Sequence, residues 1–174
     1  IGGTYNGKPI MCLSHGIGPD NIDIVINELD ALANIDFETR EVRHTRRRLT
    51  MVRIGTSGAL QPELIVGTPV IAEKAIGFDG VLNYYAGRNE VADLEFENAF
   101  CEHTGWNPLW AKPYVVNADE ELVEQIGRDD MVRGNTISAV GFYGPQGREL
   151  RLPLANPDLN SRIESFRHNG RKVT

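Results

Sequence analysis

Residues 50–58 read Thr-Met-Val-Arg-Ile-Gly-Thr-Ser-Gly, an apolar run that ends in a glycine turn. The run predicts a β-strand over Thr50–Ile54. Ligands of open α/β sheets bind beyond the carboxyl ends of strands, which is where this turn is expected. The glycines let main-chain N–H groups approach an anion, Thr56 and Ser57 add hydroxyl donors, and Arg53 adds a charged fork that suits phosphate. The stretch indicates an anion-binding loop, although an ordinary strand–turn junction can have the same composition.

Strand-like and helix-like patterns alternate on both sides of this stretch. Asn6-Gly7 predicts a hairpin that leads into a buried strand at Pro9–Ser14. A helix capped by Asp20 or Asn21 follows, with apolar residues on one face as far as Leu32. Further strands are expected at residues 64–72, 113–117, 136–140 and 172–174, and helices at 90–102, 119–126 and from Asn156-Pro157 to Gly170. Such alternation predicts an α/β sheet that is covered on both faces.

Composition excludes several classes of protein. The chain has 174 residues, which suits one domain, and its net charge of -6 disfavours nucleic acid and anionic membranes as partners. Its two cysteines, Cys12 and Cys101, form neither a disulfide framework nor a metal site, and Cys12 is expected to be a buried, reduced thiol in a cytoplasmic protein. The basic run around Arg46-Arg47-Arg48 has no interleaved aromatic residues, which favours a solvated loop or a subunit contact over nucleic-acid binding.

A second loop, at residues 142–148, carries a different set of functional groups. Phe142 offers a face for stacking, and Gln146 has both a donor and an acceptor for an amide-like edge. Arg148 can stabilise negative charge on an oxygen. A pyrimidine base presents these features, because it is flat, has an N–H between two carbonyls and gains charge as it leaves. A solvated Gly-Pro surface turn is the alternative interpretation.

These segments occur in an order that resembles the uridine phosphorylases of the nucleoside phosphorylase-I superfamily. The order is Ser14-His15-Gly16-Ile17-Gly18, then Arg53-Ile54-Gly55-Thr56-Ser57-Gly58, then Phe142-Tyr143 with Gln146 and Arg148. The resemblance implies a three-layer αβα fold around a central mixed, twisted sheet. It also implies that residues 1–174 form one partial domain, cut within the sheet at both ends, with the family's phosphate loop and its Glu-Met-Glu segment outside the chain.

The resemblance also assigns roles to individual residues. Phosphate would be bound by Arg53 and Thr56. The nucleoside would be bound by Ser57, Gly58, Phe142, Gln146 and Arg148. No transition-metal site or organic cofactor is implied. Some family members bind potassium at a dimer contact close to the positions of Ile17 and Asn21, but Asn21 replaces the family's Ser.

The implied reaction is reversible phosphorolysis of uridine to uracil and ribose 1-phosphate, in nucleoside catabolism and pyrimidine salvage. Phosphate is the co-substrate, and the full-length enzyme would be a homodimer or a hexamer built as a trimer of dimers. Two alternatives stay open: a hydrolytic nucleosidase of the same fold, and a non-catalytic domain that binds nucleosides or supports an oligomer. The sequence does not separate uridine from thymidine or deoxyuridine as the preferred substrate.

Overall fold

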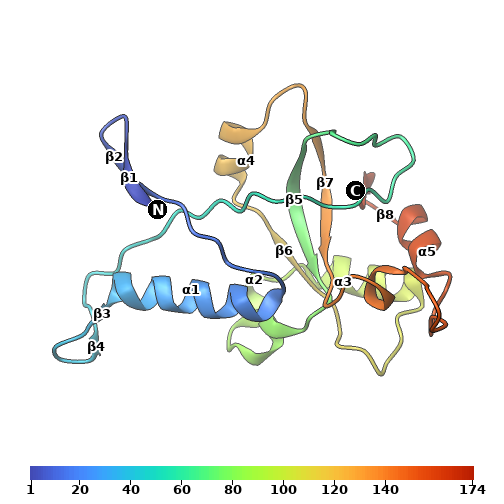
Figure 1. The fold of residues 1–174 in the computed structure, drawn as a ribbon. Coiled ribbons are helices and arrows are strands. Elements are labelled where there is room, and N and C mark those ends of the chain that lie inside the picture. Colours follow the sequence, from blue (N-terminus) through green and yellow to red (C-terminus); the bar gives the residue numbers. More distant parts are fainter. The chain divides into compact units, whose positions relative to one another are not determined.

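The computed structural model describes every residue from Ile1 to Thr174. The chain packs as two compact units, Ile1–Ile54 and Gly55–Thr174. Figure 1 shows the helices and strands of both units in the order of the sequence.

The first unit begins with the expected hairpin, in which β1 (Gly2–Tyr5) pairs with β2 (Lys8–Met11) in antiparallel register. Asn6 and Gly7 form the two-residue turn with φ angles of 49° and 74°, the left-handed conformation that such a turn requires. The strand is four residues long rather than the expected Pro9–Ser14, and Cys12 is exposed. The expectation of a buried Cys12 is therefore wrong, because β2 has only β1 as a neighbour in its sheet.

Helix α1 (Pro19–Asn34) follows the hairpin, and β3 (Ile35–Asp36) then pairs with β4 (Glu41–Val42). The prediction that Asp20 or Asn21 caps α1 is wrong, because both lie inside the helix and Gly18 precedes it without a side-chain cap. Pro19 occupies the first turn, where the absence of an N–H costs nothing.

Two predicted strands differ from the structure. Residues 50–54 form no strand, since β structure needs a partner and these residues pair with no other strand. The strand expected at residues 64–72 is instead β5 (Val70–Gly77). A turn closes ahead of it, with the N–H of Thr68 donating to the carbonyl of Ile65 at 3.1 Å.

The second unit contains a mixed sheet, which confirms the α/β class. Its central strand β5 pairs with β6 (Tyr114–Asn117) in antiparallel and with β7 (Val132–Ser138) in parallel orientation. Strand β7 begins four residues before the predicted strand at residues 136–140 and ends two residues earlier. The carboxyl ends of β5 and β7 lie at the same edge of the sheet, because the two strands are parallel.

Helix boundaries depend on side-chain caps. The single helix expected at residues 90–102 is divided into α2 (Arg88–Val91) and α3 (Leu94–Thr104), because Asp93 caps α3 by accepting a hydrogen bond from the N–H of Phe96. The predicted cap Asp119 on α4 (Glu120–Ile126) is confirmed by its bond from the N–H of Leu122. Two short 3₁₀ turns, η1 and η2, cover Val81–Tyr84 and Gly144–Gln146.

The last helix, α5, is shorter than expected and covers Leu159–Ser165. Its expected start at Asn156-Pro157 and its expected end at Gly170 are both wrong. Gly170 lies in a second Asn-Gly turn, between β8 (Arg167–His168) and β9 (Arg171–Lys172). The turn residues Asn169 and Gly170 have φ angles of 49° and 75°, so this hairpin has the same left-handed turn conformation as the first one.

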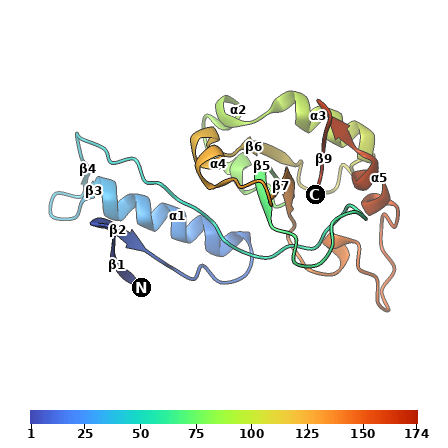
Figure 2. The same ribbon diagram turned by 90° about the horizontal axis from the view of Figure 1, so that it is seen from above.

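The hydrophobic core of the second unit lies between its sheet and two helices. Helix α3 contacts β6 and α5 (Figure 2). Phe96 and Phe100 of α3 are fully buried, and their rings lie 5.2 and 5.3 Å from the ring of Phe166. Each fully buried side chain of this size contributes about 1.5–3 kcal/mol through the hydrophobic effect. Ile76 and Val115, neighbours on β5 and β6, complete the sheet side of this core.

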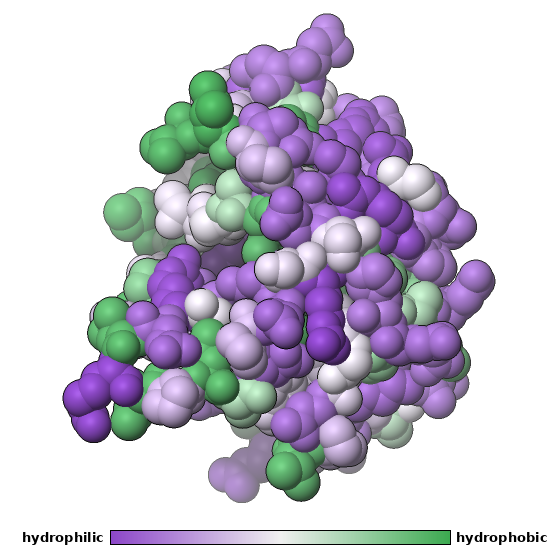
Figure 3. Space-filling view, turned by 90° about the vertical axis from the view of Figure 1, so that its right-hand side faces the viewer, coloured by the Kyte–Doolittle hydropathy of each residue, from purple (hydrophilic) through white to green (hydrophobic).

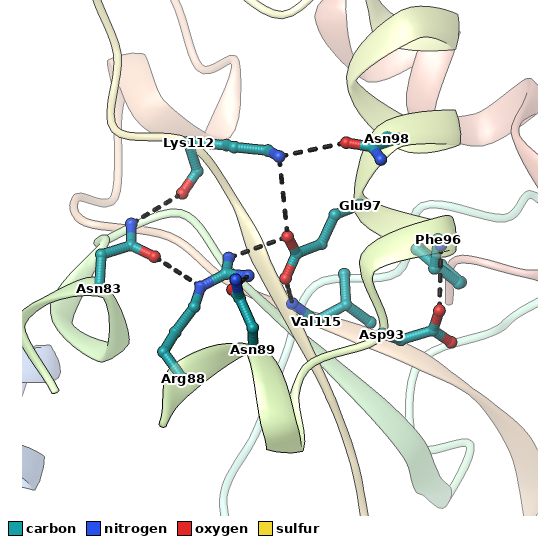
Figure 4. A network of polar contacts seen from close by, with 9 residues as sticks. All are labelled: Asn83, Arg88, Asn89, Asp93, Phe96, Glu97, Asn98, Lys112 and Val115. Carbon is teal, nitrogen blue, oxygen red and sulfur yellow. Dashed lines mark hydrogen bonds and ion pairs between the residues drawn. The ribbon is translucent and has the colours of Figure 1, made fainter. Parts of the chain in front are cut away.

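A buried carboxylate connects α2, α3 and β6 (Figure 4). Glu97 of α3 has no exposed surface, and its Oε2 lies 2.8 Å from Nη2 of Arg88. Its Oε1 accepts a hydrogen bond from the N–H of Val115 at 3.0 Å. Lys112 Nζ lies 3.9 Å from the same carboxylate and also donates to Asn98. A buried charge is tolerated when it is paired and hydrogen-bonded in this way.

Large hydrophobic side chains are exposed in both units. Figure 3 shows a mostly hydrophilic face on which hydrophobic side chains gather toward one side. Leu150 and Leu152, in the segment after the second predicted site loop, are among the exposed large apolar residues. None of the helices combines the length and the apolar character needed to cross a lipid bilayer.

Candidate functional site

The loop at residues 142–148 follows the carboxyl end of β7 and is closed by its own main chain. The carbonyl of Tyr143 accepts hydrogen bonds from the N–H groups of Gln146 and Arg148, at 3.0 and 2.9 Å. The N–H of Gly147 donates to the carbonyl of Gly144 at 3.0 Å. The predicted Gly-Pro turn therefore has a defined conformation, which fixes the main-chain positions of Gln146 and Arg148.

Arg148 gathers the polar groups of this loop. Its Nη1 donates to the carbonyl of Phe142 at 2.9 Å and also bonds Oε1 of Gln146. Its Cζ lies 4.1 Å from the centroid of the Phe142 ring, a cation–π arrangement. The structure thus brings together all three side chains that the sequence singled out in this loop.

The guanidinium of Arg148 also reaches the first predicted loop. A Cβ on Gly58 would lie 3.3 Å from Nη2 of Arg148, so the glycine allows this close approach. Thr56 and Ser57, which directly precede Gly58, are exposed and available to a ligand. Two motifs far apart in the sequence therefore meet, and the residue that joins them is Arg148.

Arg53 belongs to the first unit, which ends at Ile54, whereas Thr56 belongs to the second. Arg53 is exposed and lies in an irregular segment instead of the predicted strand. Its cooperation with Thr56 on phosphate stays a prediction.

A cavity of about 780 Å³ lies beside the second loop. Tyr143, Pro145 and Arg148 form one part of its wall. Aromatic side chains of Phe78, Trp106 and Trp110 form another, with the ring centroids of Phe78 and Trp106 4.6 Å apart. Sequence reasoning missed both tryptophans. Two Trp residues in a short Pro-containing segment were the available signal, since Trp is enriched at binding surfaces.

Asp79, two residues beyond β5, is a third residue that sequence reasoning missed. It lines the cavity, and its Oδ1 accepts hydrogen bonds from the N–H of Val81 at 2.8 Å and from Oη of Tyr114 at 3.0 Å. Burial, and then the charge and hydrogen bond of Asp79, raise the pKa of Tyr114 well above its ordinary value. The Tyr114 hydroxyl donates to both oxygens of the Asp79 carboxylate and holds it at the carboxyl edge of the sheet.

The Tyr114 ring needs the glycine at position 77. A Cβ on Gly77 would lie 2.2 Å from Cζ of Tyr114, which is far inside van der Waals contact. No larger residue fits at this position without displacing the ring from Asp79.

The suggested potassium ligands lie close together in the first unit. Nδ2 of Asn21 donates to the carbonyl of Ile17 at 2.6 Å. In this arrangement Asn21 presents an N–H group to the Ile17 oxygen, whereas potassium needs oxygen ligands. The two residues are joined by this hydrogen bond, and a potassium site beside them stays a prediction.

Comparison with known proteins shows which proteins the chain is similar to. The chain is 34% identical over 149 residues to the uridine phosphorylase of Haemophilus influenzae, which covers 84% of this chain and 45% of that protein. It is 31% identical over 170 residues to the uridine phosphorylase of Thermococcus kodakarensis, covering 96% of this chain and 46% of that protein. The chain thus spans about half the length of the curated relatives it matches.

A crystal structure provides the structural counterpart. It is a Trypanosoma brucei nucleoside phosphorylase described as showing uridine phosphorylase activity. It superposes with a TM-score of 0.82 at 28% identity and covers 99% of this chain and 64% of its own. The family model of the phosphorylase superfamily matches residues 1–163. The sequence, the mixed α/β fold and these matches together establish that the chain belongs to the phosphorylase superfamily.

Proposed function

We propose that the complete protein carrying this chain catalyses the reversible phosphorolysis of uridine to uracil and ribose 1-phosphate. The observation that supports this most is the arrangement of Arg148, which lies against Gly58 while it bonds Gln146 and stacks on Phe142. The uridine phosphorylases among the relatives and the T. brucei structure agree with this proposal.

In this proposal, Gln146 and Arg148 bind the edge of uracil, and Phe142 packs against the nucleoside. Negative charge grows on the base as the glycosidic bond lengthens. Donors that match this growing charge lower the barrier more than they strengthen ground-state binding. Ser57 and Gly58 line the nucleoside pocket beside them.

Phosphate is the nucleophile and attacks the anomeric carbon of the ribose. Arg53 would provide a charged fork for it and Thr56 a hydroxyl and main-chain donor. The protein contributes positioning and charge complementarity without a covalent intermediate. The proposed reaction needs inorganic phosphate as co-substrate, and it includes no organic cofactor and no step through potassium.

The proposal also includes a biological setting and an oligomeric state. We place the enzyme in nucleoside catabolism and pyrimidine salvage in the cytoplasm, as a homodimer or a hexamer. A reducing compartment agrees with two cysteines that form no disulfide. Size-exclusion chromatography with light scattering tests the oligomeric state, and a monomer would contradict this part of the proposal.

The decisive experiment measures uracil release from uridine by the full-length protein, with and without phosphate. Phosphorolysis predicts release only with phosphate, together with ribose 1-phosphate as product. Equal release without phosphate, with free ribose as product, would instead identify a hydrolytic nucleosidase. Binding of uridine without any release would identify a non-catalytic nucleoside-binding domain. Thymidine and deoxyuridine, assayed in parallel, establish the substrate preference.

A further inference from the structure

One side chain of helix α5 is hydrogen-bonded to the second loop, residues 142–148. Nδ2 of Asn160 donates a hydrogen bond to the main-chain carbonyl of Gln146 at 3.0 Å. Asn160 is half-buried, and its neighbour Leu159 and Ile163 one turn later are buried in the core. Since these two side chains anchor α5, Asn160 holds the loop from a fixed support.

Gly147 makes room for this contact. It has a φ of 70°, and a Cβ at this position would lie 2.4 Å from Nδ2 of Asn160. The amide of Asn160 therefore occupies the space that any other residue at position 147 would fill. Asn160 is thus matched to the loop in two ways: it donates a hydrogen bond to Gln146, and it occupies the space left free by the missing side chain of Gly147.

Neither contact involves the groups that would touch a ligand. Asn160 bonds the main chain of Gln146, which leaves the Gln146 side chain to Arg148. The N–H of Arg148 is fixed to the carbonyl of Tyr143 in the same turn. Fixing the carbonyl of Gln146 therefore sets the direction in which both side chains leave the loop.

We propose that Asn160 is a positioning residue for base recognition, which acts through the main chain of Gln146 and does not touch the substrate. This inference rests on the proposed function, in which Gln146 and Arg148 bind uracil. Loss of the Asn160 hydrogen bond frees the loop to move about Gly144 and Gly147. The base contacts weaken as a result, whereas Arg53 and Thr56, the residues assigned to phosphate, are unchanged.

The sharpest variant is Asn160→Asp, which keeps the size and shape of the side chain. A carboxylate cannot donate to the Gln146 carbonyl and repels it. Asn160→Ala removes the group altogether, and Ser161→Ala is the matched control, because Ser161 is the next residue of α5 and is exposed. All three are made in the full-length protein.

Two measurements test the proposal. Steady-state kinetics with uridine and phosphate varied separately should show that the KM for uridine rises about tenfold in both Asn160 variants, since small misplacements of binding groups have effects of this order or larger. The KM for phosphate should stay within about twofold of the wild type. Hydrogen exchange of the peptide covering residues 142–148, measured without substrate, should be faster in both variants and unchanged in Ser161→Ala.

The outcomes separate the two proposals. Equal increases in the KM for uridine and phosphate, or unchanged exchange of the 142–148 peptide, would overturn the role of Asn160. If the wild type has no activity on uridine, the proposed function fails, and the exchange measurement still decides whether Asn160 holds the loop. If Asn160→Asp unfolds, both the kinetics and the hydrogen exchange are measured on Asn160→Ala, which introduces no charge.

Discussion

At the scale of single residues, Arg148 combines several contacts that a different cation would not reproduce. Its planar guanidinium bonds the Phe142 carbonyl and Gln146 through one nitrogen and approaches Gly58 with another. A lysine has one ammonium group and no planar face to stack on Phe142. We therefore infer that the role of Arg148 depends on its planar guanidinium as well as on its positive charge.

We expect Arg148→Ala to lower kcat/KM for uridine by about 10²-fold, or about 2.7 kcal/mol of transition-state stabilisation. Arg148→Lys should recover only part of this loss, because the charge returns without the fork. Steady-state kinetics on the full-length enzyme measures both. Arg128→Ala, which removes an exposed arginine paired only with Asp130, is the control for net charge. Wild-type kinetics in Arg148→Ala would refute the assigned role.

The sequence singled out the side chains of the second loop by their chemistry, and the structure brings them together, whereas their binding of a base stays a prediction. An aromatic ring, an amide and a guanidinium within residues 142–148 suit a planar polar ligand wherever the loop lies. Asn160, Trp106 and Asp79 carry no such signal, since their contacts arise from packing between distant segments. A single sequence does not show which distant residues lie within contact distance of one another.

At the scale of elements, the pair of Glu97 and Arg88 joins two helices. Removing one partner of a buried pair costs about 3–5 kcal/mol, and without Arg88 the nearest cation to the Glu97 carboxylate is Lys112 Nζ at 3.9 Å. We expect Arg88→Met to lower the free energy of unfolding by about this amount. Glu97→Gln keeps an acceptor for the N–H of Val115. The double variant should therefore lose less than the sum of the two single variants.

Urea unfolding of the four proteins in this cycle measures the coupling. The exposed pair of Arg128 and Asp130 is the matched control, since solvent screens it and its removal should change little. Additive losses in the Glu97 cycle would mean that the buried pair has no specific coupling.

The cap of α3 makes stability depend on pH. Burial raises the pKa of Asp93, but the bonds from Lys74 and from the N–H of Phe96 outweigh it and hold the pKa below the ordinary value of 3.8. A carboxyl with a lowered pKa in the folded state stabilises the protein above its unfolded pKa and loses this contribution as the pH falls through the folded value.

We expect Asp93→Asn to be less stable than the wild type at neutral pH and to approach it below about pH 4. Asn is also a good capping residue, so the variant removes the charge and retains the cap. Urea unfolding between neutral and acidic pH tests this, with Glu102→Gln, an exposed carboxylate on the same helix, as the control. A stability difference that does not change with pH would contradict the expectation.

Element types were easier to predict than element boundaries. Residues 50–54 have the composition of a strand, but pairing decides whether a strand forms and composition does not reveal the partner. Asp93 divides a region with continuous helical potential, because its side chain bonds the Phe96 N–H instead of continuing the helix. Asn6-Gly7 and Asp119, in contrast, act on immediate neighbours, and both predictions are confirmed.

At the scale of the whole molecule, the two units differ in how they are packed. Every buried hydrophobic residue of the core, from Ile76 to Val173, belongs to the second unit. In the first unit, α1 has only one buried residue, Asn34. The α/β class could be predicted from alternating patterns, whereas this division could not, since it depends on which distant segments pack together.

We expect amide hydrogen exchange to be faster in α1 than in α3, because segments with few buried contacts open at lower free-energy cost. Exchange measured by mass spectrometry on peptides from residues 19–34 and 94–104 makes the comparison directly. Peptides from β5, which is paired on both sides, provide the slow-exchanging reference. Equal protection of α1 and α3 would contradict this expectation.

The two Asn-Gly turns are also sites where the protein is expected to deamidate. The main-chain nitrogen of a glycine can attack the side-chain amide carbon of the preceding asparagine, which expels ammonia and forms a succinimide. Water then opens the ring to aspartate or isoaspartate. Asn6 and Asn169 are both exposed and followed by glycines without a Cβ to hinder the attack. Isoaspartate lengthens the main chain by one carbon, which a two-residue turn cannot accommodate, so deamidation in storage should loosen both hairpins and leave each with an added negative charge.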